Sequence, residues 1–205
     1  MHPNPIFHDA DDVKNLNHAR SAGFGMLAVN GGDGPMLAHV PFLLSEDGSV
    51  AELHLVRSNP IARALGGPMT AKIAVGGPHS YVSPDWYGVD DQVPTWNYVA
   101  VHLTGTLEKC PQEELRDLLD RQSEMFEEKL RPKVPWRTGK MTPEVLDKMM
   151  RQIVPCRMSV EAVDGTWKLS QNKPDDVRLR AADGVEQFGV GTGLDVLAQW
   201  MRDSK

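Results

Sequence analysis

The chain has 205 residues, of which 40% are apolar and 24% charged, and its formal net charge is −6. A chain of this length and composition can bury a full core without disulfides or metal ions, which excludes disordered and fibrous classes. The negative balance argues against a broad nucleic-acid surface, because non-specific DNA affinity comes from basic residues that neutralise phosphates. No apolar run is long enough to span a membrane and no secretory leader is visible, so we expect a cytoplasmic protein without membrane contact.

The N-terminal half of the chain predicts one short helix followed by strands. Residues 11–22 have an acidic first turn, which favours the start of a helix. Strands are expected over residues 25–29 and 37–44, joined by a glycine-rich turn at residues 30–34. Three further strands are expected along the chain, over residues 50–57, 70–75 and 98–108.

The strand at residues 98–108 has the clearest alternation of the chain, with Val99, Val101, Leu103 and Leu107 on one face. The remaining elements are expected as helices over residues 112–130, 142–150 and 194–201 and as strands over residues 156–163 and 167–170. Antiparallel strands with helices grouped between them indicate an α+β, mainly β fold. We expect one domain, residues 1–205, with a helical insert at about residues 111–151.

The segment Arg57-Ser58-Asn59-Pro60 ends a strand and opens a short helix, with Asn59 as the N-cap and Pro60 at the first helical position. Free amides at a helix start, beside a guanidinium and a hydroxyl group, could bind an anion. The alternative is a well-capped helix with an arginine on the surface. The residues alone leave both interpretations open.

Two aromatic segments come next. Residues 76–87 contain two glycines and three aromatic residues, and Tyr81 and Ser83 offer a flat face and a hydroxyl group to a ligand. Residues 93–98 place Thr95, Trp96 and Asn97 at the start of the best strand, where an amide and a hydroxyl group could meet the edge of a heterocycle. The alternatives are an aromatic plug that closes a barrel and a core cluster with satisfied polar groups.

The segment of residues 168–173 follows an apolar strand and is rich in cations and amides. Lys168, Ser170, Gln171 and Lys173 could bind phosphate or carbonyl edges, although polar strand ends of this kind are also common as exposed turns. Another basic segment, residues 130–140, has no acidic residue and is either a partner-binding loop or a solvated connection.

No catalytic or metal-binding pattern stands out. The seven histidines lack metal-ligand spacing, and Cys110 and Cys156 form no CxxC pair, so we expect two reduced cysteines and no metal site. No serine or cysteine lies in a G-x-S-x-G elbow, so hydrolysis is unsupported and no catalytic residue is assigned.

The order of these segments resembles the PaiB family of FMN-binding negative transcriptional regulators. Two runs are the specific part of the resemblance, VPTWNYVAVHLTG from Val93 to Gly105 and KLSQNK from Lys168 to Lys173. The start of the chain matches more loosely, with His2 where the family commonly has tyrosine. The other matching pieces are HVPF at residues 39–42, LHLVRSNP at residues 53–60 and GPHSYVSPDWY at residues 77–87.

The resemblance implies an FMN-binding split β-barrel of about six antiparallel strands that forms homodimers, with FMN in a cleft between subunits. A six-stranded barrel has an interior filled by side chains, so a flavin must lie outside it. On this basis we expect each part of the cofactor to meet a different segment. Arg57, Ser58 and Asn59 would hold the phosphate, Tyr81, Ser83, Thr95, Trp96 and Asn97 would meet the flavin, and Lys168, Ser170, Gln171 and Lys173 would complete the site from the partner subunit.

The family name implies repression of transcription and a possible contact with DNA. The helices of residues 112–151 are separated by eleven or more residues, too many for the tight turn of a helix-turn-helix motif. The alternative is an FMN-dependent oxidoreductase, related to flavin reductases or pyridoxamine-phosphate oxidases, because a bound flavin supplies its own redox chemistry.

Overall fold

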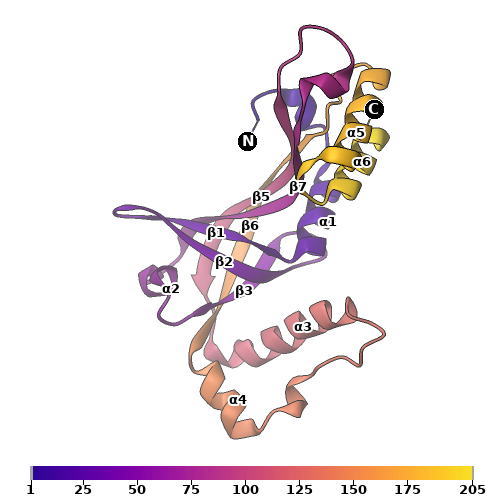
Figure 1. Ribbon diagram of the computed structural model, residues 1–205. Helices are drawn as coiled ribbons and strands as arrows, with labels where there is room; N and C mark the ends of the chain where they lie inside the picture. The colour runs from indigo at the N-terminus through magenta and orange to yellow at the C-terminus, as the bar shows by residue number, and fades with distance from the viewer. Residues whose placement is uncertain (1, 205) are drawn as a thin grey trace. The chain divides into compact units, whose positions relative to one another are not determined.

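The computed structural model describes residues 2–204, which divide into two compact units. The first unit contains residues 2–18, 75–102 and 163–204, and the second contains residues 19–74 and 103–162. Helix α1 (Asp12–Ala22) and strands β4 (Met69–Val82), β5 (Thr95–Lys109) and β6 (Ile153–Lys168) run through both units (Figure 1). Each unit is described separately below.

The second unit holds a closed antiparallel barrel. Its strands are β1 (Phe24–Gly31), β2 (Gly34–Leu44), β3 (Val50–Val56) and the adjoining parts of β6, β5 and β4. Strand β1 pairs with β2 along its whole length and also with β4, from Met26↔Ala74 to Val29↔Ala71, which closes the ring. This confirms the predicted antiparallel split barrel of about six strands.

The alternation predicted for β5 is confirmed. Val101, Leu103 and Leu107 are fully buried, and Val99 is 2% exposed. At Gly105, an added Cβ would lie 1.9 Å from the backbone oxygen of Ser159, so only glycine allows this part of β5 to pair closely with β6.

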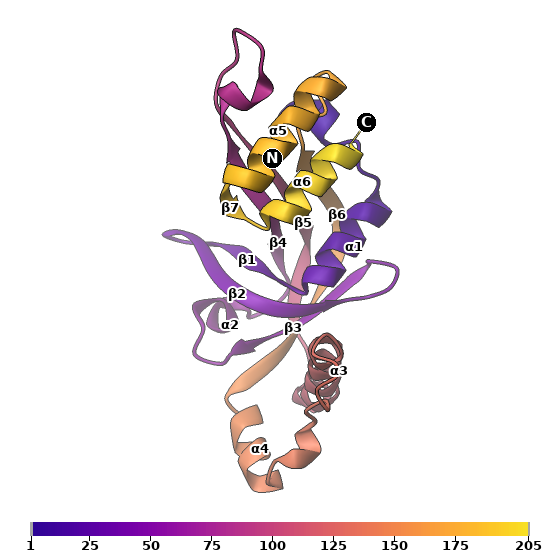
Figure 2. The same ribbon diagram turned by 45° about the vertical axis from the view of Figure 1, so that its right-hand side comes forward.

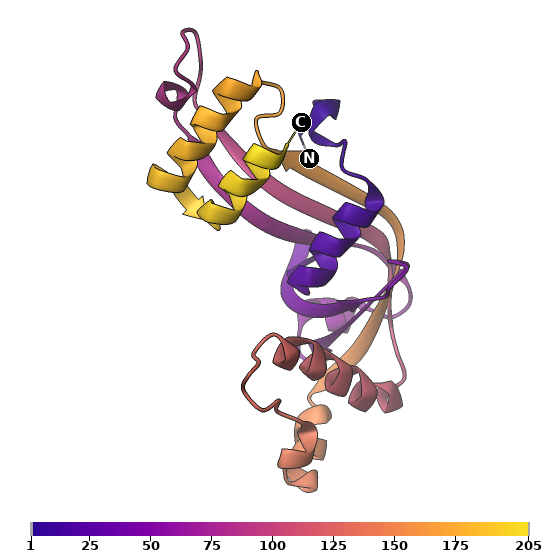
Figure 3. The same ribbon diagram turned by 90° about the vertical axis from the view of Figure 1, so that its right-hand side faces the viewer.

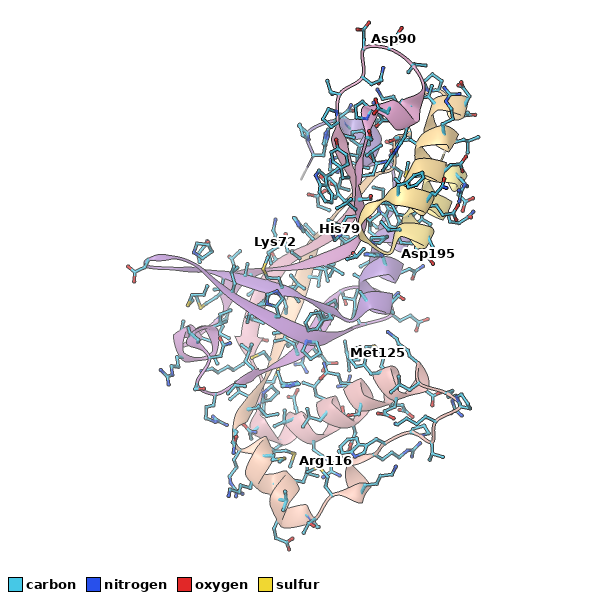
Figure 4. All side chains as sticks on the ribbon, in the orientation of Figure 1. Lys72, His79, Asp90, Arg116, Met125 and Asp195 are labelled. Atoms are coloured by element: carbon cyan, nitrogen blue, oxygen red, sulfur yellow. The ribbon has the colours of Figure 1, made fainter. Side chains whose placement is uncertain are left out.

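The predicted helical insert is also confirmed and lies in the second unit. It contains a 3-10 turn (Gln112–Glu114), α3 (Leu115–Glu128), a second 3-10 turn (Thr138–Lys140) and α4 (Pro143–Met150). Figure 4 shows Met125 and Arg116 extending to opposite sides of α3. The methyl group of Met125 packs against Gly23, whose φ of +58° ends α1, while Arg116 donates to Thr138 Oγ1 at 2.7 Å.

The basic segment of residues 130–140 is paired with α3. Arg131 Nε lies 2.5 Å from a carboxylate oxygen of Glu128, and Lys133 forms an ion pair with Glu127. These cations are therefore compensated within their own unit, as in a solvated connection.

The first unit continues β4, β5 and β6 as an open sheet, to which β7 (Val190–Thr192) adds an edge through the pairs His79↔Thr192 and Tyr81↔Val190. Helices α5 (Asp175–Phe188) and α6 (Leu194–Asp203) lie side by side against this sheet (Figures 2 and 3). The predicted helix of residues 194–201 is confirmed. The core between these elements contains Val82, Tyr87, Val99, Trp167, Leu169, Val177, Ala181, Ala182, Val185, Leu197, Ala198 and Met201.

Two sequence expectations were wrong for strands that enter this unit, and two of its elements were not expected. The strand expected to end at residue 75 continues as β4 to Val82, and β6 is one strand from Ile153 to Lys168 instead of two. Helix α5 and strand β7 were missed, although Val177, Ala181 and Val185 stand at helical spacing. The extension of β4 depends on pairing with β7, which lies more than a hundred residues further along the chain.

Candidate functional site

A pocket of about 240 Å³ lies entirely within the first unit. Four parts of the chain line it: the N-terminal segment with its 3-10 turn (Pro5–Phe7), the end of the 3-10 turn Pro84–Tyr87, the start of β5, and the residues that follow β6. The lining residues are His2, Asn4, Phe7, Tyr87, Val93, Thr95, Asn97, Lys168, Ser170, Asn172 and Lys173.

Two hydrogen bonds join the TWN and KLSQNK runs inside this pocket. Thr95 and Asn97 share one face of β5 because strand side chains alternate. Lys168 donates from Nζ to Thr95 Oγ1, and Asn97 Nδ2 donates to Ser170 Oγ at 2.8 Å. Within a single chain, therefore, the two runs line one pocket, and completion of a flavin site by the KLSQNK run of a partner subunit stays a prediction.

The pocket is positively charged. Lys168 and Lys173 line it, and no carboxylate occurs among its described lining residues, although the whole chain carries a net charge of −6. Burial lowers the pKa of Lys168, and burial together with the nearby Lys168 lowers the pKa of His2. Lys173 Nζ donates to Gln92 Oε1 at 2.5 Å and lies 5.1 Å from the centre of the Tyr87 ring. Such a pocket favours an anionic or electron-rich ligand.

Asn97, one of the lining residues, has an unpaired acceptor. Its side chain is fully buried, and its Nδ2 lies 3.4 Å from Met201 Sδ in addition to bonding Ser170. Its Oδ1 has no hydrogen-bond partner among the described residues. A buried carbonyl oxygen without a donor is unfavourable, so this atom would gain from a ligand that carries an N–H or O–H group.

The polar network continues to Ser170 and Tyr87. Ser170 has a φ of +64°, a left-handed conformation that is unfavourable for a residue with a Cβ. Burial raises the pKa of the Tyr87 phenol, and a hydrogen bond with Ser170 partly opposes this rise. Ser170 thus holds both Asn97 and Tyr87 in place, at the cost of a strained backbone.

The other predicted residues of this unit lie outside the pocket lining. Gln171 is engaged structurally, since its side chain accepts from Leu169 N and donates to the Ile6 and Trp167 carbonyl oxygens. Trp96 is 46% exposed on the opposite face of β5 from Asn97, and its ring contacts Tyr81. Ser83 caps the 3-10 turn Pro84–Tyr87 by accepting from Asp85 N. A cofactor contact by these residues stays a prediction.

Arg57, Ser58 and Asn59 belong to the second unit. The Arg57 guanidinium donates to Gln112 Oε1 at 2.8 Å and to the carbonyl oxygens of Arg151 and Ile153. Asn59 is the N-cap of α2 (Pro60–Ala64) and accepts from Ile61 N at 2.9 Å, which confirms the capped helix. The phosphate role of these three residues stays a prediction.

Five pocket residues were not assigned as site residues from the sequence. They are His2, Asn4, Phe7, Tyr87 and Asn172. All five lie in the parts of the chain that carry the family resemblance, which are its loosely matching start, GPHSYVSPDWY and KLSQNK. These parts of the sequence therefore indicated where the pocket residues lie, but which of their side chains face the pocket depends on the folded backbone.

Other kinds of site find no support in residues 2–204. No group of three or more histidine, cysteine, aspartate or glutamate side chains there could hold a metal ion. Both cysteines are free, and burial raises the pKa of Cys156 to about 12, which leaves it a poor nucleophile. In the same range, no helix is long and apolar enough to cross a membrane.

Comparisons with known proteins agree with this fold. A family model described as "Putative FMN-binding domain" matches residues 1–162. The chain is 30% identical over 159 residues to the protease synthase and sporulation protein PAI 2 of Bacillus subtilis (strain 168), which covers 77% of this chain and 75% of that protein.

Two solved structures share the fold. The FAD and heme binding protein from Mycobacterium smegmatis superposes with a TM-score of 0.59 at 16% identity, over 79% of this chain and 73% of that chain. The flavocytochrome Anf3 from Azotobacter vinelandii gives a TM-score of 0.52 at 13% identity, over 82% of this chain and 72% of that chain. The fold is the split barrel of flavin-binding proteins, and the chain belongs to the PaiB-type family of FMN-binding proteins.

Proposed function

We propose that the chain binds FMN through the first-unit pocket and acts, as a homodimer, as a flavin-dependent negative regulator of transcription. One observation carries the flavin site: two lysines and Asn97, whose amide oxygen is unpaired, line a pocket that has no carboxylate among its described lining residues, in a member of an FMN-binding family. The family-model match ends at residue 162, so Lys168, Ser170 and Lys173 lie beyond it and are assigned by the resemblance of the KLSQNK run and by the geometry of the pocket.

The donor set of the pocket fits a flavin. A flavin combines a flat ring, carbonyl oxygens, one ring N–H group and an anionic phosphate. The pocket offers aromatic walls in Phe7 and Tyr87, ammonium donors in Lys168 and Lys173, and an acceptor in Asn97. The groups in the pocket therefore complement features of a flavin, of which the pocket holds a part. When bound, FMN would supply one- and two-electron redox chemistry, and the protein would bind and orient it.

The small volume of the pocket supports the proposal of a homodimer. Pockets that enclose a drug-sized ligand usually measure at least ~300 Å³, and this pocket of about 240 Å³ holds only part of FMN. The rest of the cofactor then requires a second surface, which a second copy of the chain would supply. Sedimentation velocity with and without FMN tests this step, and a species that remains monomeric in both conditions would refute it.

The flavin site is tested by titrating purified protein with FMN and following fluorescence quenching. Lys173→Met should weaken FMN binding about tenfold, because a hydrogen bond to a charged group contributes about 1.5 kcal/mol. Lys148→Met is the matched control, since Lys148 is an exposed lysine of α4. Absence of FMN binding by the unaltered chain would refute the proposed function.

The regulatory role is supported by the family and by the name of the Bacillus subtilis relative, which links that protein to protease synthesis and sporulation. The basic segment of residues 130–140 is not assigned to a DNA contact, because carboxylates of α3 pair with two of its four cations, Arg131 and Lys133. Filter binding to genomic fragments at two salt concentrations, with oxidised and with reduced FMN, tests the role. A regulator that contacts DNA should bind in a salt-sensitive way in one flavin state, and no binding in either state would count against it.

A second candidate is an FMN-dependent oxidoreductase. The observation that favours it is the pair of cations in the pocket, since a positive charge beside a flavin stabilises its reduced, anionic form. Anaerobic addition of NADH or NADPH to the FMN-loaded protein should then bleach the visible absorbance. An unchanged spectrum with both nucleotides would refute simple reductase activity.

A further inference from the structure

We infer that the loop of residues 88–94 is a strap tied to the first-unit pocket by one hydrogen bond, between Gln92 and Lys173, and that an anionic ligand releases the strap by taking the Lys173 ammonium group. The inference rests on the proposed function, because FMN is taken as the ligand. It goes further by coupling occupancy of the pocket to the order of a surface loop, whatever reaction the flavin performs.

Both ends of this loop are anchored. At its start, Arg180 Nε donates to the Tyr87 carbonyl oxygen at 2.9 Å, and Gly88 turns the chain with a φ of +64°. At its end, the chain enters β5 at Thr95. Figure 1 shows the connection extending beyond the end of the sheet, and Figure 4 places Asp90 at its tip. The order of the tip therefore depends on the contacts made between the two anchors.

One side chain ties the tip of the loop to the pocket. The amide group of Gln92 is engaged on both sides: its Nε2 donates to the Asp90 carbonyl oxygen at 3.1 Å, and its Oε1 accepts from Lys173 Nζ at 2.5 Å. Among residues 2–204, residues 89–92 form no ion pair and no hydrogen bond besides these two. Val89 is 45% exposed, so packing adds little at the tip. The bond to Lys173 is therefore the contact that holds the loop against the pocket.

Lys173 serves the pocket and the loop with the same ammonium group. The residue lines the pocket, is half-buried, and its Nζ lies 5.1 Å from the centre of the Tyr87 ring as well as bonding Gln92. An anionic acceptor attracts an ammonium group more strongly than a neutral amide oxygen does, because Coulombic attraction adds to the hydrogen bond. An anionic group of a ligand in the pocket would therefore draw Nζ away from Gln92, and the loop would lose its tie.

The coupling must act in both directions. If the ligand weakens the bond between Lys173 and Gln92, this bond weakens ligand binding by the same factor. A chain that lacks the bond should therefore bind FMN more tightly, by about three- to tenfold for the net contribution of one hydrogen bond. The direction is diagnostic, because removal of a residue that contacts FMN would weaken binding, whereas removal of an autoinhibitory contact strengthens it.

The test replaces Gln92 by methionine, which keeps the length of the side chain and removes both amide contacts. Gln187→Met is the matched control, since Gln187 is an exposed glutamine of α5 in the same unit. Backbone order parameters of residues 89–92 are measured by ¹⁵N relaxation. Without ligand, we expect rigid values of about 0.85 in the unaltered chain and in the control, and values below about 0.6 in Gln92→Met. Saturating FMN should lower the values of the unaltered chain to the same range.

FMN titrations of the same three chains test the reciprocal effect. Gln92→Met should bind FMN about three- to tenfold more tightly than the unaltered chain, and Gln187→Met should bind it equally. The inference is overturned if Gln92→Met leaves the loop ordered, if bound FMN leaves it ordered, or if Gln92→Met binds FMN no more tightly. If the unaltered chain binds no FMN, the proposed function fails and release by FMN fails with it, whereas FMN binding with an ordered loop refutes this inference alone.

Discussion

Replacing Gly165 by alanine should destabilise the protein through one specific contact. A Cβ at position 165 would lie 1.9 Å from Asn15 Oδ1 and 2.5 Å from Asn15 Cγ. Asn15 is 3% exposed and is held by two hydrogen bonds: its Oδ1 accepts from Trp167 Nε1 at 2.8 Å, and its Nδ2 donates to the Ala10 carbonyl oxygen at 3.3 Å. The alanine therefore displaces a buried amide that joins α1 to β6.

The size of the destabilisation follows from the hydrogen bonds that the displaced Asn15 amide loses. Loss of two hydrogen bonds costs about 1 kcal/mol each, and leaving the indole N–H of Trp167 without an acceptor adds at least about 1 kcal/mol. Alanine returns about 0.5–1 kcal/mol because glycine is intrinsically unfavourable in a strand. We therefore expect the free energy of unfolding to fall by about 2–3 kcal/mol, measured by urea denaturation at constant m-value.

A double-mutant cycle isolates the contact. In an Asn15→Ala background the obstructing amide is absent, so Gly165→Ala should no longer destabilise the protein and should raise the free energy of unfolding by about 0.5–1 kcal/mol. The reasoning is refuted if the substitution costs the same in both backgrounds, or if it is neutral in the unaltered chain.

Three further predictions concern stability. Burial lowers the pKa of His54, so below about pH 6.5 the unfolded chain binds more protons than the folded chain, and the free energy of unfolding decreases as the pH is lowered. His54→Gln should make this decrease between pH 7.5 and 5.5 smaller, as measured by urea titrations. An equal decrease in the variant and the unaltered chain would contradict the assignment. Ser170 has a φ of +64°, a conformation that glycine adopts more easily than alanine, and both substitutions remove the hydrogen bond to Asn97. The Ser170→Gly variant should therefore be about 1 kcal/mol more stable than the Ser170→Ala variant. Equal melting temperatures of the two variants would argue against backbone strain. Arg121→Ala removes a part-exposed pair with Glu52 and should cost about 1 kcal/mol at low salt and less at 1 M NaCl; a salt-independent loss would point to packing instead.

Local patterns were enough for much of the fold. The alternation of Val99, Val101, Leu103 and Leu107 predicted the buried face of β5, because strand side chains alternate whatever their partners. Asn59 followed by proline predicted the cap of α2, since a cap acts on amides two residues away. Each of these signals extends over only a few residues.

The candidate site could be predicted only in part. The sequence marked the TWN and KLSQNK runs, and Thr95, Asn97, Lys168, Ser170 and Lys173 do line one pocket. The face occupied by Trp96, the structural engagement of Gln171 and the participation of the N-terminal segment did not follow from residue types. Whether a polar side chain is free for a ligand depends on which partners the fold gives it.

The sequence by itself determined most of the strands and helices, which face of β5 is buried, and which short runs are unusual in composition. Only the tertiary structure decided that Asn97 and Ser170, 73 positions apart, share a hydrogen bond and that Asn97 Oδ1 is left without a partner. The physical reason is that periodicity and capping act over a few residues, whereas the association of β5 and β6 brings together side chains that no local pattern relates.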